Sequence, residues 1–275
     1  MTYLDSLLLS IPFPYSLITV CTLMVCICLL AVKAHALTWD GAAAAFAVGV
    51  GVLWCLMLEG FLILMFFFLS AGVLGRISRK YKNKNLEKKE GARDAVQVFA
   101  NGFLATLGAL GYYFFRTPVF LVIFIASMAE ANSDTWAGEI GRLSRRKPVS
   151  IRTFKPVEKG ISGGITALGI IGGFLGSASV CIIAALLFPI DSIWLLCSMA
   201  CLAAFAGCIL DSLLGAYAQV LYFDPSTGNV TERDTDAQGN PLEISQGIRW
   251  VDNDMVNFMS NTFSAVLAMG LVCWI

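Results

Sequence analysis

Long apolar runs alternate with short polar segments along almost the whole chain. Each run is close to the roughly 20 residues that a helix needs to cross a bilayer. The runs predict about eight membrane-spanning helices, near residues 12–32, 39–57, 60–76, 95–114, 118–138, 161–188, 193–222 and 255–275. The second and third runs flank Glu59 and Gly60 and are also compatible with one kinked element, which would lower the count by one. We therefore expect an all-α, polytopic integral membrane protein.

The first apolar run, Ile11 to Val32, has no basic segment before it and no Ala-x-Ala cleavage site after it. Signal peptides carry both features. We therefore expect this run to be a retained span.

The composition supports a membrane protein. Of the 275 residues, 57% are hydrophobic and only 14% are charged, whereas soluble domains carry roughly a quarter charged residues. The net charge is zero, and nothing indicates nucleic-acid binding. All nine cysteines lie inside apolar runs, which favours small buried hydrophobes over disulfides or a zinc site. The only histidine, His35, lies at an expected helix end, so a mechanism in the core cannot depend on histidine.

Lysine and arginine gather in two connections, Arg76–Arg93 and Arg142–Lys159. Two expected spans separate them, so both can lie on the cytoplasmic side, where short loops carry most positive charge. Two further spans bring Tyr222–Trp250 to the same side, and its turn residues predict a small hairpin. We therefore expect a single transmembrane domain over residues 1–275. Its cytoplasmic loops would be 77–93, 142–159 and 223–250, and both termini would lie outside.

The segment from Glu130 to Gly141 holds three carboxylates directly after an apolar run. A carboxylate at membrane depth costs at least about 2.5 kcal/mol unless it is paired, hydrated or bound to a cation. On a helix, Glu130 and Asp134 share one face, whereas Glu139 lies on nearly the opposite one. A helix that is polar on two sides faces protein or water. We expect this segment to hold metal and phosphate at a membrane-embedded active site.

Three further expected spans begin or end with polar residues at helical spacing. The three stripes are Arg93, Asp94, Gln97 and Asn101; Asp211, Ser212, Gly215 and Gln219; and Asn253, Asp254, Asn257, Ser260 and Asn261. One such stripe is typical of hydrogen bonding between helices. Three stripes at the cytoplasmic end, together with the acidic segment, favour a shared polar cavity.

The segment Lys155–Thr166 is rich in glycine and hydroxyl groups. Gly160, Gly163 and Gly164 allow close approach of the backbone to a ligand, and Ser162 adds a hydroxyl. We expect the segment to open a helix, whose free N–H groups favour phosphate, with Lys155 and Lys159 as cations. The later glycines, Gly169, Gly172, Gly173 and Gly176, predict helix packing. The chain has no P-loop signature.

Asp134 and Asp211 are the best metal candidates, with Asp254 as a third ligand and Glu130 and Glu139 nearby in the acidic segment. Magnesium prefers one or two protein carboxylates and completes its shell with phosphate oxygens and water. The alternative for each aspartate is a buried ion pair, for which Arg93 and Arg142 are available. From the residues we expect the site to divide by role. Catalytic groups are Asp134, Asp211, Arg93 and Lys159; nucleotide- and phosphate-binding groups are Lys155, Gly160, Ser162, Gly163, Gly164, Asn101, Gln97, Asn253 and Asn257; metal ligands are Asp134, Asp211, Glu130, Glu139 and Asp254.

Five motifs occur in an order that resembles one family. They are Glu90–Gly102, Asn132–Gly141, Gly160–Gly164, Asp211–Ala216 and Trp250–Asn257. The chain is similar, over roughly residues 40 to 275, to the integral-membrane family that includes transmembrane protein nineteen and the plant phytyl-phosphate kinase of vitamin E synthesis. Between Asp134 and Glu139 the chain has Trp136, where the family has small residues.

The resemblance implies transfer of a phosphoryl group from a nucleoside triphosphate to an isoprenyl monophosphate, with Mg²⁺, to give the prenyl diphosphate. Likeness to polyprenol kinases and CDP-lipid synthases implies CTP as the donor, with ATP as an alternative. The expected partners are the two substrates, the lipid bilayer and, through the surface of residues 160–176, a second copy of the chain. The expected location is a prokaryotic plasma membrane or an organellar membrane, with the site facing the cytoplasm.

Two other functions remain open at this point. A CTP-dependent lipid cytidylyltransferase would use the same groups but release pyrophosphate. A transporter of anionic lipids or small anions would use Glu130, Asp134 and Asp211 as ion or proton sites. Transporters typically show internal repeats and polar residues at the bilayer midplane. This chain has no clear repeat, and its polar residues gather towards one membrane face.

Overall fold

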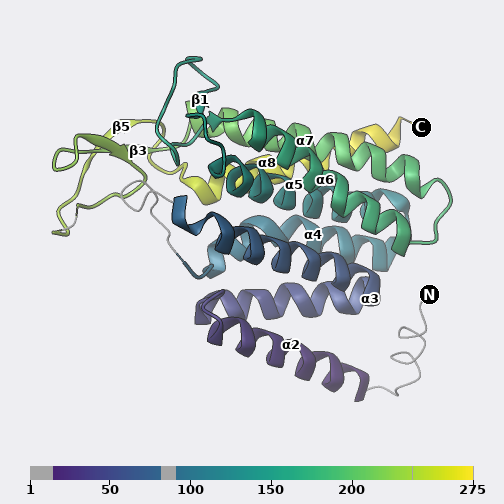
Figure 1. Cartoon of the computed structure of the whole chain (residues 1–275). Coiled ribbons are helices and arrows are strands. Elements are labelled where there is room, and N and C mark those ends of the chain that lie inside the picture. Colours follow the sequence, from purple (N-terminus) through teal and green to yellow (C-terminus); the bar gives the residue numbers. More distant parts are fainter. Residues whose placement is uncertain (1–14, 82–90, 237, 275) are drawn as a thin grey trace.

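The computed structural model describes residues 15–81, 91–236 and 238–274, and within them the fold is a bundle of long helices (Figure 1). The helices are α2 (Tyr15–Lys33), α3 (Trp39–Ser78), α4 (Ala95–Phe115), α5 (Pro118–Arg142), α6 (Ala167–Leu187), α7 (Ile193–Tyr217) and α8 (Asn253–Cys273), with a short 3-10 turn η1 (Arg79–Tyr81) after α3. Among the described residues, six helices are long and apolar enough to cross a membrane; α5 is not one of them. The all-α membrane fold is confirmed, but the count of eight spans is not.

Helix α3 folds back on itself at Met57, whose backbone is non-helical (φ 53°, ψ −147°). The contacts of Arg93 demonstrate this reversal, because Arg93 touches α3 on both sides of Met57. Its carbonyl accepts from the Thr38 N–H, next to the start of α3, at 3.0 Å, and its guanidinium lies 5.0 Å from the ring centre of Phe67 in the second half. A straight helix would place Thr38 and Phe67 about 40 Å apart. The two expected spans flanking Glu59 thus form one helix interrupted by a sharp reversal, with its halves lying side by side in Figure 1.

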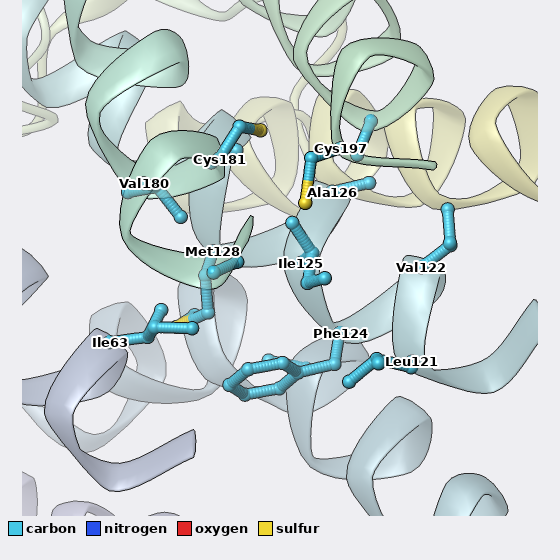
Figure 2. Packing of buried hydrophobic residues seen from close by; sticks show 14 of the residues in the cluster. Ile63, Leu121, Val122, Phe124, Ile125, Ala126, Met128, Val180, Cys181 and Cys197 are labelled. Atoms are coloured by element: carbon cyan, nitrogen blue, oxygen red, sulfur yellow. The ribbon is translucent and has the colours of Figure 1, made fainter. Parts of the chain in front are cut away.

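Helix α5 lies at the centre of the bundle and packs against α3, α4, α6, α7 and α8. Its residues from Leu121 to Ser133 are almost all fully buried. Figure 2 shows Leu121, Phe124, Ile125 and Met128 packed between neighbouring helices. Because protein surrounds α5, its polar residues face other helices rather than lipid, as the two-sided polar pattern predicts.

The glycines of α6 bring α6 and α5 into close contact. A Cβ on Gly169 would lie 2.9 Å from the Ala137 carbonyl oxygen, and one on Gly176 would lie 2.9 Å from the Asn132 carbonyl oxygen. Only glycine fits at such a distance from a neighbouring backbone. The predicted packing role of these glycines is confirmed: they bring α6 against α5 of the same chain.

The connections form small sheets at one end of the bundle, opposite the start of α2 and the end of α8 (Figure 1). β1 (Val149–Ser150) pairs antiparallel with β2 (Gly164–Ile165). β3 (Leu221–Asp224) lies between β4 (Asn229–Thr231) and β5 (Glu243–Gln246) in a three-stranded antiparallel sheet. The expected hairpin is therefore part of a larger sheet.

Several predicted boundaries are wrong by a few residues. α6 begins at Ala167 rather than near 161, because Gly164 and Ile165 pair as a strand and the Thr166 hydroxyl caps the helix by accepting from the Gly169 N–H at 2.9 Å. α7 ends at Tyr217 rather than near 222, because the chain enters β3 at Leu221. Parts of the first expected span (12–14), the first expected loop (82–90) and the last expected span (275) lie outside the described residues.

Candidate active site

A cavity of about 880 Å³ lies where the loop end of the bundle meets the three-stranded sheet. Its walls come from residues 91–97, the end of α5, the segment 159–166, the start of α6, the end of α7, the sheet and the start of α8. Twelve predicted site residues line it: Arg93, Gln97, Asp134, Glu139, Lys159, Gly160, Ser162, Gly163, Gly164, Asp211, Asn253 and Asp254. The shared cavity expected from the polar stripes is thus present.

Four predicted site residues do not line the cavity. Lys155 is exposed on the loop. The Asn101 amide donates to the Gln97 carbonyl of its own helix at 2.9 Å. Glu130 is buried and Asn257 lies beside Asp211. The α4 and α8 stripes therefore divide: Gln97, Asn253 and Asp254 line the cavity, whereas Asn101 bonds its own helix and Asn257 bonds Asp211 of α7.

Asp134 of α5 and Asp211 of α7 both line the cavity, and their carboxyl groups interact directly with each other. On the α8 side, the Ser260 hydroxyl donates to Asp211 Oδ2 at 3.2 Å, and the Asn257 amide, with its nitrogen turned inward, donates to the same oxygen at 3.1 Å. Two carboxylates this close repel each other unless a proton or cation lies between them.

Arg142 and Arg93 are the cations whose charges act favourably on the Asp134 carboxylate. Arg142 also pairs with Glu139 at 3.0 Å, and Glu139 accepts from the Ser78 hydroxyl. Burial lowers the pKa of the Arg93 guanidinium, while the Glu139 and Asp134 carboxylates oppose this shift. Arginine nevertheless stays protonated in proteins. The α5 end of the cavity therefore combines carboxylates with two permanent cations.

Glu130 lies beneath the cavity in a closed hydrogen-bond network. Its carboxyl oxygens accept from the Ser260 hydroxyl and from the Asn261 amide, each at 2.8 Å. Asn261 also bonds Ser127, accepting from its hydroxyl at 2.6 Å and donating to its carbonyl at 2.9 Å. Ser260 bridges this network to Asp211. Glu130 thus links α5 to α8 by hydrogen bonds, and it is connected to Asp211 through Ser260.

Lys159 and the glycine segment form another wall. The Lys159 ammonium donates to the carbonyl oxygens of Arg142, the last residue of α5, at 3.0 Å and of Ser144, just beyond it, at 2.6 Å. Gly163 has φ +76°, and a Cβ there would lie 2.4 Å from that of Ala216 on α7. The glycines lie in a loop before α6 rather than at its N-terminus, and part of their role is contact with α7.

The region of the three-stranded sheet also contributes to the cavity, which the polar stripes do not predict. Glu232, just after β4, accepts from the Ser162 hydroxyl and from the Gln219 amide, both at 2.8 Å. Arg249 and Asp234 also line the cavity. No periodic pattern marks these residues, because pairing of β3 with β4 and β5 brings them to the cavity.

Oxygen ligands dominate the charged lining, and this chemistry fits a hard cation such as Mg²⁺. Within the described part of the chain, no three His, Cys, Asp or Glu side chains are grouped closely enough to hold a metal by themselves. A magnesium ion whose shell is completed by phosphate and water needs only one or two protein carboxylates, which Asp134 and Asp211 would supply.

The comparisons with known proteins agree with this architecture. The family model described as integral membrane protein DUF92 matches residues 22–265. An uncharacterised membrane protein of Methanocaldococcus jannaschii is 34% identical over 70% of this chain and 80% of its own length. Protein PGR of Arabidopsis thaliana is 27% identical, over 74% of this chain and 78% of its own length. Protein VTE6, chloroplastic, of the same plant is 24% identical over 85% of this chain and 64% of its own. No solved structure matches.

Proposed function

The chain belongs to the DUF92 family of integral membrane proteins, and we propose that it is an isoprenyl-monophosphate kinase of the phytyl or geranylgeranyl type. In this reaction a phosphate oxygen of the isoprenyl monophosphate attacks the terminal phosphorus of a nucleoside triphosphate. The bond from that phosphorus to the bridging oxygen breaks, and the nucleoside diphosphate leaves. The family resemblance and the similarity to VTE6 support the substrate class.

The observation that carries the proposal is the interacting pair of Asp134 and Asp211 in a cavity flanked by arginines. Phosphoryl transfer depends on positioning and on neutralising phosphate charge more than on covalent chemistry by the protein. The acceptor is itself a phosphate, largely ionised near neutral pH, so the reaction needs no strong base. A site without histidine is therefore suited to this chemistry.

Each group in the cavity has a defined task under this proposal. Arg93 and Arg142 bind phosphate oxygens, since guanidinium groups match phosphate geometry. Asn257 and Ser260 hold the Asp211 carboxylate in one orientation through their hydrogen bonds. Lys159 contributes by fixing the end of α5, which carries Arg142. Asp134 and Asp211 would hold Mg²⁺, which supplies charge neutralisation at the phosphates when bound.

The test is a product assay with purified protein in detergent. The mixture contains Mg²⁺, phytyl monophosphate and CTP or ATP labelled in the terminal phosphate. The proposal predicts labelled phytyl diphosphate and unlabelled nucleoside diphosphate. Pyrophosphate release with a CDP-linked lipid would instead identify a cytidylyltransferase. No turnover with either donor, together with anion flux in liposomes, would identify a transporter.

A further inference from the structure

The cavity continues from the acidic pair into an apolar seam between α6 and α7. The residues of this seam that line the cavity are Gly169, Ile170, Phe205, Cys208, Ile209 and Ser212, which we call the α6–α7 window. Apart from Ser212 they carry no charged or hydroxyl group. They lie on helices that are apolar enough to cross a membrane. The window is therefore an apolar part of the cavity wall on two candidate membrane-spanning helices.

Close contacts bound the window above and below. Above it, a Cβ on Gly215 of α7 would lie 3.2 Å from the Gly163 nitrogen, so the loop rests directly on the helix. Below it, a Cβ on Gly173 would lie 3.3 Å from Cys208 Sγ. Cys208 and Gly215 are seven residues apart, which corresponds to about 10 Å along a helix. Gly163 of the loop thus packs against α7 above the window, and α6 packs against α7 at Gly173 and Cys208 below it.

The window reaches the outer flank of the bundle. Phe174 and Phe205 form an edge-to-face pair at its lower boundary, with ring centres 5.6 Å apart. Phe174 is 45% exposed and does not line the cavity. Ile170 lies one turn from Phe174 on the same side of α6, is 39% exposed, and does line the cavity. Ile170 therefore joins the cavity to the lipid-facing flank.

The window also meets the phosphate site directly. Cys208 lies on α7 one turn from Asp211; its thiol interacts with the Ser133 hydroxyl of α5 and is within reach of the charge of Asp134. A molecule with a phosphate head and an apolar tail would place its head at the two aspartates and its tail at Cys208, Ile209 and Phe205. Burying that tail against apolar side chains is favourable in proportion to its area.

We propose that the α6–α7 window admits and binds the isoprenyl chain of the phosphate substrate, which reaches the site sideways from the bilayer. This inference rests on the proposed function, and it places the isoprenyl chain at α6 and α7 and the nucleotide on the side of the loops and the sheet.

The first test compares two neighbouring isoleucines of α6. Ile170→Trp fills the window, whereas Ile171→Trp changes a residue that is 56% exposed and does not line the cavity. For Ile170→Trp we expect kcat/KM for phytyl monophosphate to fall about tenfold or more, since a few methylene groups lose their burial. Its kcat/KM for the five-carbon dimethylallyl monophosphate should stay within about twofold, and Ile171→Trp should change neither value.

The second test needs no catalysis and uses the unmodified chain. Phytyl monophosphate with a diazirine at the far end of its chain is photolysed with the protein in liposomes, and the labelled peptides are identified. Labelling of α6 and α7 beside the window supports the inference, whereas labelling confined to other helices would overturn it.

Failure of the kinase and failure of the window can be told apart. A wild-type protein that turns over no isoprenyl phosphate refutes the kinase, and the photolabel then decides separately whether the window binds the isoprenyl chain. If the wild-type protein is an active kinase and Ile170→Trp leaves the ratio of kcat/KM for phytyl and dimethylallyl monophosphate unchanged, the role of the window is refuted and the kinase proposal stands.

Discussion

At the scale of single residues, the structure separates carboxylates that face the cavity from one that does not. Asp134 and Asp211 line the cavity, and their carboxyl groups interact with each other. Glu130 does not line the cavity and accepts hydrogen bonds from Ser260 and Asn261. Glu130 and Asp134 are four residues apart on one face of α5, and Asp211 lies on α7. The difference is set by which neighbouring helix each side chain meets, and the sequence alone does not supply that information.

The position of Glu130 predicts a structural effect when it is replaced. Glu130→Ala leaves the Ser260 hydroxyl and the Asn261 amide without this acceptor, so we expect the free energy of unfolding to fall by about 1–3 kcal/mol. Glu130→Gln keeps one acceptor and should lose less. Thermal unfolding in detergent measures both, with Glu243→Ala on the exposed β5 as the control.

Glu130→Gln also distinguishes a structural role of Glu130 from a role as a metal ligand. In Glu130→Gln we expect the Mg²⁺ concentration for half-maximal activity to rise by no more than about 100-fold, the upper range for a residue that acts on a metal only through the ligand it supports. A rise well beyond a hundredfold would show that Glu130 is itself a ligand.

At the scale of elements, contact between α5 and α6 positions the site. α5 carries Asp134 and Arg142, and the glycines of α6 allow its backbone to approach α5 closely. The sequence predicted this packing correctly, because small residues recur at helical spacing. It did not predict that α6 starts only after residue 166, since strand pairing between Gly164–Ile165 and Val149–Ser150 joins distant segments.

Two glycine substitutions should act in opposite directions. Gly176→Ala places a Cβ 2.9 Å from the Asn132 carbonyl oxygen, so α5 and α6 must separate, and we expect a loss of about 1–3 kcal/mol of unfolding free energy. Gly72→Ala meets nothing within 4 Å and should be neutral or stabilising by up to about 1 kcal/mol, because alanine favours a helix. Thermal melts of the two variants in one detergent make the comparison. Equal destabilisation by both would contradict close packing at Gly176.

At the scale of the whole molecule, the fold gathers every element of the site at one end of the bundle (Figure 1). The membrane class, the helices and twelve of the sixteen predicted site residues at the cavity followed from hydropathy, from polar stripes and from the glycine-rich segment. Glu232 and Arg249, which follow β4 and β5, did not, because their place depends on strand pairing across a long connection. The reversal at Met57 was visible only as an interruption near Glu59 and Gly60.

This arrangement predicts which loops share a side of the membrane. Thr227 lies in the turn between β3 and β4 at the site end, and Asp191 lies between α6 and α7 at the other end; both are exposed. In a cysteine-free background, Thr227→Cys and Asp191→Cys should react with a membrane-impermeant maleimide from opposite sides of sealed, oriented membranes. Equal labelling from one side would contradict a bundle that spans the bilayer.

The central claim, that Asp134 and Asp211 act together in phosphoryl transfer, is tested most directly by a double-mutant cycle. kcat/KM for phytyl monophosphate is measured for Asp134→Asn, Asp211→Asn and the double variant at several Mg²⁺ concentrations. Residues that act as one unit give non-additive losses, so we expect each single change to cost about a thousandfold or more and the double to cost little beyond that. Thermal stability should hold or rise in all three, since removing a charge relieves repulsion between the carboxylates. Activity within about tenfold of wild type in either folded single variant would contradict the claim.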